Sequence, residues 1–301
     1  MAKPFLKWVG GKGQLIPQLT ALLPSDFASW QNVTYIEPFI GGGAMLFHML
    51  KTYPNITHAV INDINIDLTT CYLTIRDHPY ELIMSLRQIQ TQYYAMTDEV
   101  ARRDYYMIKR DRFNTKALGP VENTSLFIFL NRTCFNGLYR VNRKGLFNVA
   151  FGRYDNPMIC DETTILEDSL LLQNVEITTG DFCQTLQYAV SKPTLFYFDP
   201  PYRPLSNTSN FKDFSKEAFE DDDQIRLKEC CDELNAAGHS FMLSNSDPMG
   251  KDGDGDTFFD DLYAKYIIER VWATRRVNSN ASKRGKLTEI LVHNYKTNTN
   301  E

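Results

Sequence analysis

The sequence lacks several patterns that would place it in common protein classes. No apolar run reaches the roughly 18 residues that a membrane-spanning helix needs. The start, Met1-Ala2-Lys3-Pro4-Phe5, has no apolar core of a secretion signal. The six cysteines are scattered and form no C-x-x-C pair, which indicates neither a disulfide framework nor a zinc site. We therefore expect a reduced, cytoplasmic protein that is not held in a membrane.

Motifs for metals and phosphates are also missing. The five histidines show no ligand spacing, and neither a P-loop nor G-x-G-x-x-G is present. Asp252, Asp254 and Asp256 alternate as in an EF-hand loop. However, Thr257 replaces the required glycine, and Tyr263 stands where the bidentate glutamate belongs. We therefore expect a flexible acidic loop and no bound metal.

The net charge of −5 argues weakly against a polyanionic partner, but the charge is unevenly distributed. From 102 to 153 there are 11 basic and 3 acidic residues, and from 265 to 286 there are 7 and 1. From 217 to 261 the balance reverses, with 3 basic and 14 acidic residues. Such segments are typical of a protein that binds a polyanion with one face, although solvated helix faces would also explain them.

Short apolar segments alternate with helical patterns along much of the chain. The alternation predicts an α/β sheet with parallel strands. The expected strands are Thr34–Ile36, Ala59–Ile61, Val175–Thr178, Leu195–Phe198, Ser240–Leu243 and Ile290–Val292. The expected helices between them are Gly43–Thr52, Ile66–Arg76, Phe182–Ala189 and Ala218–Ala237.

The region between residues 71 and 161 has a different character. It is rich in helix formers and aromatic residues, with helices expected at Tyr80–Tyr94 and Val100–Phe113. The stretch from Asn131 to Tyr154 then carries turn signals at Asn136-Gly137 and Lys144-Gly145, which favour a β-hairpin. We interpret 71–161 as an insert that splits one domain into 1–70 and 162–301.

Two glycine-rich segments are candidate ligand loops. Gly41-Gly42-Gly43 lies between a strand and a helix, where glycine lets the backbone approach a ligand. Asp63 ends the next strand, the position that binds a ribose hydroxyl in Rossmann-like sheets. A tight turn without a ligand is the alternative. The segment from Phe5 to Leu15 sets Trp8 and Lys12 around another diglycine, and it could be only a terminal turn.

Asp199-Pro200-Pro201-Tyr202 breaks a buried aromatic strand abruptly. Proline restricts the backbone, so this is a stiff loop that holds a carboxylate and carbonyls at the strand's carboxyl end. Ligands bind at that edge of open α/β sheets. A rigid acceptor beside an aromatic face suits an exocyclic amine on a planar ring, and a structural turn is the alternative.

Together these motifs resemble the Dam-type adenine-N6 DNA methyltransferases. The order is that of the alpha class: cofactor segment, target-recognition insert, then catalytic tetrapeptide. The segments "FNGLYRVN", "FNVAFGRY", "YFDPPYRPLS" and "MLSNS" resemble the DpnM branch, whose members methylate adenine in GATC. The resemblance implies a Rossmann-like methyltransferase sheet that uses S-adenosylmethionine, with an inserted, mainly helical target-recognition domain. It further implies a double-stranded DNA substrate and no metal, and we expect a monomer.

The resemblance also implies roles for individual residues. Asp199, Pro200 and Tyr202 match catalytic positions: the first two would accept the N–H bonds of adenine N6, and the third would stack on the flipped base. Cofactor contacts are implied for Trp8, Lys12, Glu37, Phe39, Gly41, Gly43, Asp63, Asp181, Phe182 and Asp199. DNA contacts are implied for Lys7, Arg132, Phe135, Asn136, Leu138, Arg140 and Tyr154, with Lys7 and Arg140 at base-reading positions.

Three other functions remain open from the sequence. A catalytically silent DNA-binding protein could keep the same fold, although Asp63 and the intact Asp199–Tyr202 segment argue against it. An RNA adenine methyltransferase could carry the same tetrapeptide, although Arg140 in the expected hairpin favours duplex DNA. Cytosine-N4 methylation is disfavoured because such enzymes more often have serine in place of Asp199.

Overall fold

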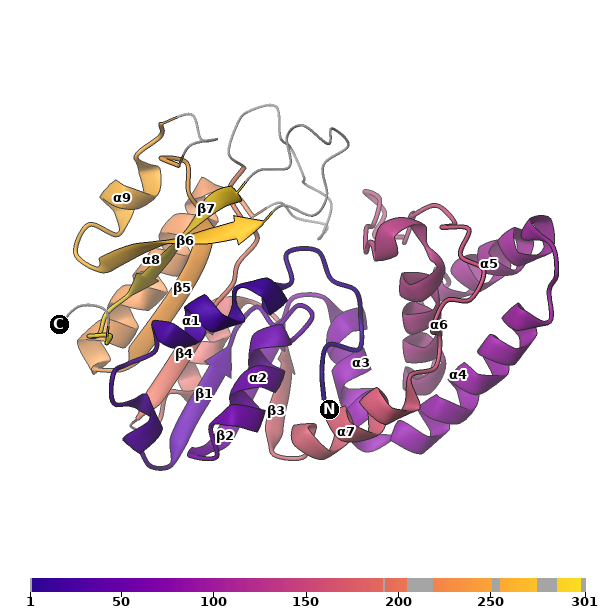
Figure 1. The fold of residues 1–301 in the computed structure, drawn as a ribbon, viewed down its shortest axis with the longest axis horizontal. Helices are drawn as coiled ribbons and strands as arrows, with labels where there is room; N and C mark the ends of the chain where they lie inside the picture. Colours follow the sequence, from indigo (N-terminus) through magenta and orange to yellow (C-terminus); the bar gives the residue numbers. More distant parts are fainter. Residues whose placement is uncertain (1, 192, 205–218, 251–254, 275–285, 299–301) are drawn as a thin grey trace.

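The computed structural model describes residues 2–191, 193–204, 219–250, 255–274 and 286–298 (Figure 1). Within these ranges the strands form one seven-stranded sheet in the order β3-β2-β1-β4-β5-β7-β6. The strands are β1 (Val33–Glu37), β2 (Ile56–Asp63), β3 (Val175–Thr179), β4 (Thr194–Phe198), β5 (Ser240–Ser246), β6 (Ile267–Thr274) and β7 (Lys286–His293). All six expected strands are present, and β6 is an additional one.

The sheet is mixed rather than fully parallel. Strands β1 to β5 pair in parallel, whereas β7 is antiparallel to both β5 and β6. The expectation of parallel strands is therefore wrong for the β7–β6 edge. A connection between parallel neighbouring strands needs a crossover of a dozen or more residues. Because β7 runs antiparallel to β5, the start of β7, and not its end, lies at the carboxyl edge of β5.

Side chains of the same strands alternate between two hydrophobic clusters. Tyr35 and Ile61 belong to one cluster, and their neighbours Ile36 and Val60 belong to the other. This alternation follows from the two-residue period of a strand. Both faces of the sheet are therefore covered, which explains why β1 and β4 are buried along their whole length and mainly apolar.

The helices include the two expected in the insert, but one expected helix differs and several helices were not predicted. Phe182–Ala189 was expected to be an α-helix, and the structure has the 3-10 helix η4 (Phe182–Tyr188) there. The longest of the unpredicted helices are α6 (Pro120–Thr133) and α7 (Glu162–Leu172). The other helices are η1 (Lys12–Gln14), α1 (Ile16–Ala21), η2 (Phe27–Ser29), α2 (Ala44–Thr52), α3 (Ile66–Asp77), α4 (Pro79–Tyr94), α5 (Glu99–Phe113), η3 (Phe135–Gly137), α8 (Asp221–Ala237) and α9 (Phe258–Leu262).

Helices α4, α5 and α6 extend to one side of the sheet (Figure 1). Every residue of α6 from Asn123 to Asn131 is buried, so this helix is surrounded by its neighbours. An all-round buried helix has no polar stripe, which explains why periodicity did not reveal it. Its core is continuous with one face of the sheet. The expected insert boundary at residue 71 falls inside α3, and that at 161 falls on the N-cap of α7.

The expected hairpin doubles back through isolated antiparallel bridges instead of continuous strands. These bridges join Cys134 to Phe151 and Val141 to Phe147. Both predicted turns are present: Asn136 and Gly137 have positive φ values of 56° and 64°, and Gly145 has φ 75°. Asn131 to Thr133 belong to α6 instead. Asp252, Asp254 and residues 275–285 of the second basic segment lie outside the described residues.

Candidate active site

Several predicted site residues meet at the carboxyl edge of the sheet. Glu37 ends β1, Asp63 ends β2 and Asp199 directly follows β4. Strands β1 and β4 are neighbours in the sheet. The strand that follows β1 in the chain, β2, lies on one side of this pair, and the strand that follows β4, β5, lies on the other side. Ligands bind in open α/β sheets at such a switch point. The edge therefore brings together residues that are far apart in the sequence.

The Asp199 carboxylate is held by two donors on the same oxygen. Lys12 Nζ lies 3.0 Å from Oδ1, and Ser244 Oγ donates to Oδ1 across 3.0 Å. Neither contact uses Oδ2. Burial raises the pKa of Asp199, and the positive charge of Lys12 opposes that rise. The lysine therefore favours the ionised carboxylate, which is an acceptor only.

Lys12 is expected to contact the cofactor, and its ammonium lies among the catalytic candidates Asp199 and Tyr202. Its side chain is only 6% exposed. Nζ lies 4.2 Å from the centre of the Tyr202 ring, 3.7 Å from Glu289 Oε2 and 3.3 Å from the carbonyl of Gly10. The cation–π contact and two carboxylates compensate for burying the charge.

Two residues of this cluster, Glu289 and Ser244, received no role from the sequence. The Tyr202 hydroxyl donates to Glu289 Oε2 across 2.6 Å. Glu289 pairs with Ser246 between antiparallel strands, which brings it to the carboxyl edge. Ser244 lies in "MLSNS", one of the segments that carry the family resemblance, and that was the available signal for this residue.

The glycine loop and Asp63 are joined by the backbone. Gly41 N donates to Asp63 Oδ2 across 3.2 Å, and Asn65 N donates to Oδ1 across 2.9 Å. Burial raises the pKa of Asp63 to about 6, partly offset by these hydrogen bonds. Each carboxylate oxygen can accept a further bond. The Trp8 ring covers the loop, because a Cβ added at Gly41 would lie 2.9 Å from Trp8 Nε1.

Glu37 is a buried acid beside this loop. It accepts a hydrogen bond from the Tyr35 hydroxyl across 2.7 Å. Burial raises the pKa of Glu37 to about 8, against the lowering effect of that hydrogen bond. The group is therefore largely protonated at neutral pH, and it can donate as well as accept.

Phe39, which is partly buried, and Phe182, which is buried, pack together near the same edge. Their ring centres are 5.1 Å apart. Asp181 is the N-cap of η4, directly before Phe182, and it receives hydrogen bonds from Arg226 Nη2 at 2.9 Å and from Cys183 N at 2.9 Å. Burial would raise the pKa of Asp181, but these bonds outweigh it and the pKa is lowered. Aromatic surface with flanking acceptors suits a nucleoside.

The predicted DNA-contacting residues gather around the turn after α6. Phe135 is 55% exposed, which is unusual for phenylalanine. The Tyr154 hydroxyl accepts from Asn136 N across 3.2 Å, and Lys7 Nζ lies 4.9 Å from the Tyr154 ring centre. A side chain at Gly137 would collide with Lys7, because an added Cβ would come 2.4 Å from its Cδ.

Asn131 was not predicted, yet it joins this turn to the N-terminal segment. Its side chain accepts from Lys7 N and donates to Lys7 O, each across 2.8 Å, and it also donates to Gly137 O across 2.9 Å. Asn131 is fully buried. The single amide therefore sets Lys7 relative to the turn, although the two are distant in sequence.

Arg140 and Leu138 differ in how they are held. Arg140 Nε donates to Asn148 Oδ1 across 2.9 Å, and its Nη2 lies 3.4 Å from Asn148 O. This leaves the end edge of the guanidinium, formed by Nη1 and Nη2, for other acceptors. Leu138 is partly buried and packs against the hydrophobic core.

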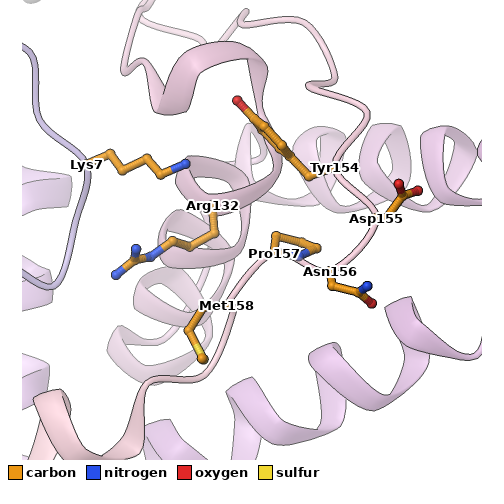
Figure 2. A pocket seen from close by; sticks show the side chains of 7 residues that line it. All are labelled: Lys7, Arg132, Tyr154, Asp155, Asn156, Pro157 and Met158. Atoms are coloured by element: carbon orange, nitrogen blue, oxygen red, sulfur yellow. The ribbon is translucent and has the colours of Figure 1, made fainter.

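Arg132 lies below the turn, at a pocket. Its Nη2 donates to Phe5 O across 2.7 Å, and burial lowers the pKa of its guanidinium. The pocket has a volume of about 260 Å³. Figure 2 shows the lining side chains, which are Lys7, Arg132, Tyr154, Asp155, Asn156, Pro157 and Met158. Arg132 is thus less available to a ligand than Arg140.

Within the part of the chain that the structure describes, no group of three or more His, Cys, Asp or Glu side chains is arranged to hold a metal ion. Among the described helices, none combines the length and the apolar character needed to cross a membrane.

Comparisons with known proteins match the chain along most of its length. Residues 8–277 match the family model described as D12 class N6 adenine-specific DNA methyltransferase. The chain is 43% identical to the type II methyltransferase M.MjaIII of Methanocaldococcus jannaschii, covering 97% of this chain and 99% of that protein. It is 38% identical to M1.LlaDCHI of Lactococcus lactis subsp. cremoris (97% and 95%) and 30% identical to the DNA adenine methylase of Haemophilus influenzae (96% and 93%).

Proposed function

Because this chain belongs to the D12 class of N6 adenine-specific DNA methyltransferases, we propose that it transfers a methyl group from S-adenosylmethionine to adenine N6 within GATC in double-stranded DNA. Membership of this family supports a site-specific DNA adenine methyltransferase. It disfavours an RNA adenine methyltransferase, a cytosine-N4 methyltransferase and a catalytically silent DNA-binding protein. The observation that supports the chemistry best is the Asp199 carboxylate, with Oδ1 held by Lys12 and Ser244 and Oδ2 outside both contacts.

The residues at the carboxyl edge fit S-adenosylmethionine. Asp63 keeps acceptor capacity for ribose hydroxyls, and the partly buried Phe39 ring, packed on Phe182, offers apolar surface to the adenine of the cofactor. Trp8, Lys12, Glu37 and the loop containing Gly41 and Gly43 border the same edge, with Asp181 flanking Phe182. When bound, the cofactor supplies a methyl group that its sulfonium charge activates.

The side chains of the tetrapeptide act on the target amine. Adenine N6 is a poor nucleophile because its lone pair is delocalised into the ring. We infer that Asp199 Oδ2 and the Pro200 carbonyl accept its two N–H bonds, which favours a more tetrahedral nitrogen. The Tyr202 ring stacks on the base and holds it for in-line attack, so alignment is a large part of the rate gain. The base must first leave the duplex, where its amine is paired.

DNA recognition is assigned to the turn region and the N-terminal segment. The end edge of the Arg140 guanidinium matches guanine O6 and N7, the commonest specific contact in the major groove. Lys7 is held beside Tyr154 by Asn131, which supports a second base contact. Phe135, Asn136 and Leu138 lie along the same turn. Arg132 is assigned a supporting DNA contact.

The test is methyl transfer from labelled cofactor to a random-sequence DNA library, followed by sequencing of the modified sites. We expect modified adenine only, confined to GATC. Modified adenine at another sequence would refute the specificity and leave the activity intact. Modified cytosine, or transfer to RNA in preference to duplex DNA, would refute the proposed reaction. Calorimetry of cofactor binding without DNA tests the cofactor assignment separately.

A further inference from the structure

We propose that Glu289 is a positioning residue for the methyl transfer, and that it acts by holding the Tyr202 ring through the phenolic hydroxyl. This inference rests on the proposed function, because Tyr202 is there assigned to stack on the target base. Neither the tetrapeptide pattern nor the comparisons give Glu289 a role.

The hydrogen bond between Tyr202 and Glu289 is short, and the Glu289 side chain is mostly buried. The Tyr202 hydroxyl donates to Glu289 Oε2 across 2.6 Å, and the Glu289 side chain is 18% exposed. Hydrogen bonds of a hydroxyl to a carboxylate are shorter and stronger than those between neutral groups. The phenolic oxygen lies on the axis of the Cβ–Cγ bond, so the hydrogen bond restrains the swing of the whole ring about Cα–Cβ and not its rotation about Cβ–Cγ. The position of the ring is therefore fixed at its far end.

The sheet makes Glu289 a rigid support. Glu289 lies within β7, paired with Ser246 of β5 on one side and Val271 of β6 on the other. Tyr202, in contrast, lies on a loop after β4. A side chain on a paired strand is positioned more precisely than one on a loop. The strand can therefore orient the loop, while the reverse effect is small.

Glu289 also lies 3.7 Å from Lys12 Nζ, which suggests a different role as a counter-charge. The two roles make opposite demands on the side chain. Holding the hydroxyl requires an acceptor atom at the right reach, and a neutral carbonyl there still accepts the hydrogen bond, although more weakly than a carboxylate. Balancing Lys12 requires negative charge but tolerates a shorter reach, because Coulomb attraction falls slowly with distance.

Two conservative variants separate these roles. Glu289→Gln keeps the length and a carbonyl acceptor for the hydroxyl but loses the charge. Glu289→Asp keeps the charge but withdraws the acceptor by one methylene. We expect Glu289→Gln to keep kcat within about threefold and Glu289→Asp to lose kcat roughly ten- to a hundredfold, since a 1 Å misplacement can cost about that much. Cofactor affinity should change little in both, so the loss appears in kcat.

A double-mutant cycle identifies the group through which Glu289 acts. Tyr202→Phe removes only the hydroxyl, and we expect it to lose about as much kcat as Glu289→Asp. The double variant should be no worse than either single variant, because both remove the same contact. Glu269→Gln, which removes a carboxylate from the neighbouring strand β6, is the matched control and should match wild type. Thermal melting confirms that each variant is folded.

The outcomes decide between the alternatives. A larger loss in Glu289→Gln than in Glu289→Asp would assign the residue to Lys12 and overturn the proposal. Losses that multiply in the double variant would also overturn it, because the two side chains would then act separately. If wild type itself transfers no methyl group to DNA adenine, the proposed function fails. If wild type is active and Glu289→Asp matches it, the positioning role alone fails.

Discussion

Replacing Arg140 by alanine should relax the choice of DNA sequence more than it weakens DNA binding. Asn148 occupies the side edge of the guanidinium through Nε and Nη2, so the end edge is left for guanine. A forked arginine–guanine contact contributes about 1–3 kcal/mol of discrimination against the wrong base. This corresponds to roughly 5- to 150-fold in relative rate. We expect Arg140→Ala to lose that factor on GATC while changing little on a site with one outer base pair altered.

Asn148→Ala tests whether the orientation of Arg140 matters. It removes a hydrogen bond worth about 0.5–1.5 kcal/mol, so discrimination should fall by roughly two- to tenfold, less than in Arg140→Ala. Arg143→Ala is the matched control, because it removes an exposed cation from the same loop. The assay measures kcat/KM on both duplexes over a range of salt concentrations. Equal losses on both duplexes, with a salt slope lower by about one unit, would identify a phosphate contact and refute the argument.

Three further variants test the carboxyl edge of the sheet. Asp199→Ala should abolish methyl transfer but keep cofactor affinity within about tenfold, or 1.4 kcal/mol; retained turnover would remove Asp199 from the mechanism. Asp63→Ala should weaken cofactor binding by about 1.5–3 kcal/mol in calorimetry, and unchanged affinity would contradict the ribose assignment. Glu37→Gln tests pH-dependent stability. The folded pKa of Glu37 is raised from 4.5 to about 8, so the folded protein keeps a proton that the unfolded chain releases between these values. Wild-type stability should therefore fall as pH rises through this window, by up to about 1.4 kcal/mol per pH unit. Urea titrations at pH 5 and 8 should show a smaller fall in Glu37→Gln, and equal falls would contradict the shift.

Local patterns in the sequence determined the central sheet and its edge. Asp63 and Asp199 could be placed there because the first ends a strand with an apolar core and the second follows an apolar strand, and parallel strands end at one edge. The turns at Asn136-Gly137 and Gly145 were also readable, since their backbone conformation favours these residue types. Helix α6 could not be predicted from the sequence, because a helix that is buried on all sides shows no amphipathic period.

The contacts that complete the candidate site depended on tertiary structure. The N-terminal segment brings Lys12 against Asp199, and no local pattern could pair residues so far apart in the chain. Asn131 joins Lys7 to the turn through a single buried amide. Glu289 reaches Tyr202 only because β7 runs antiparallel to β5, which places the early part of that strand, and not its end, at the edge where the other strands terminate.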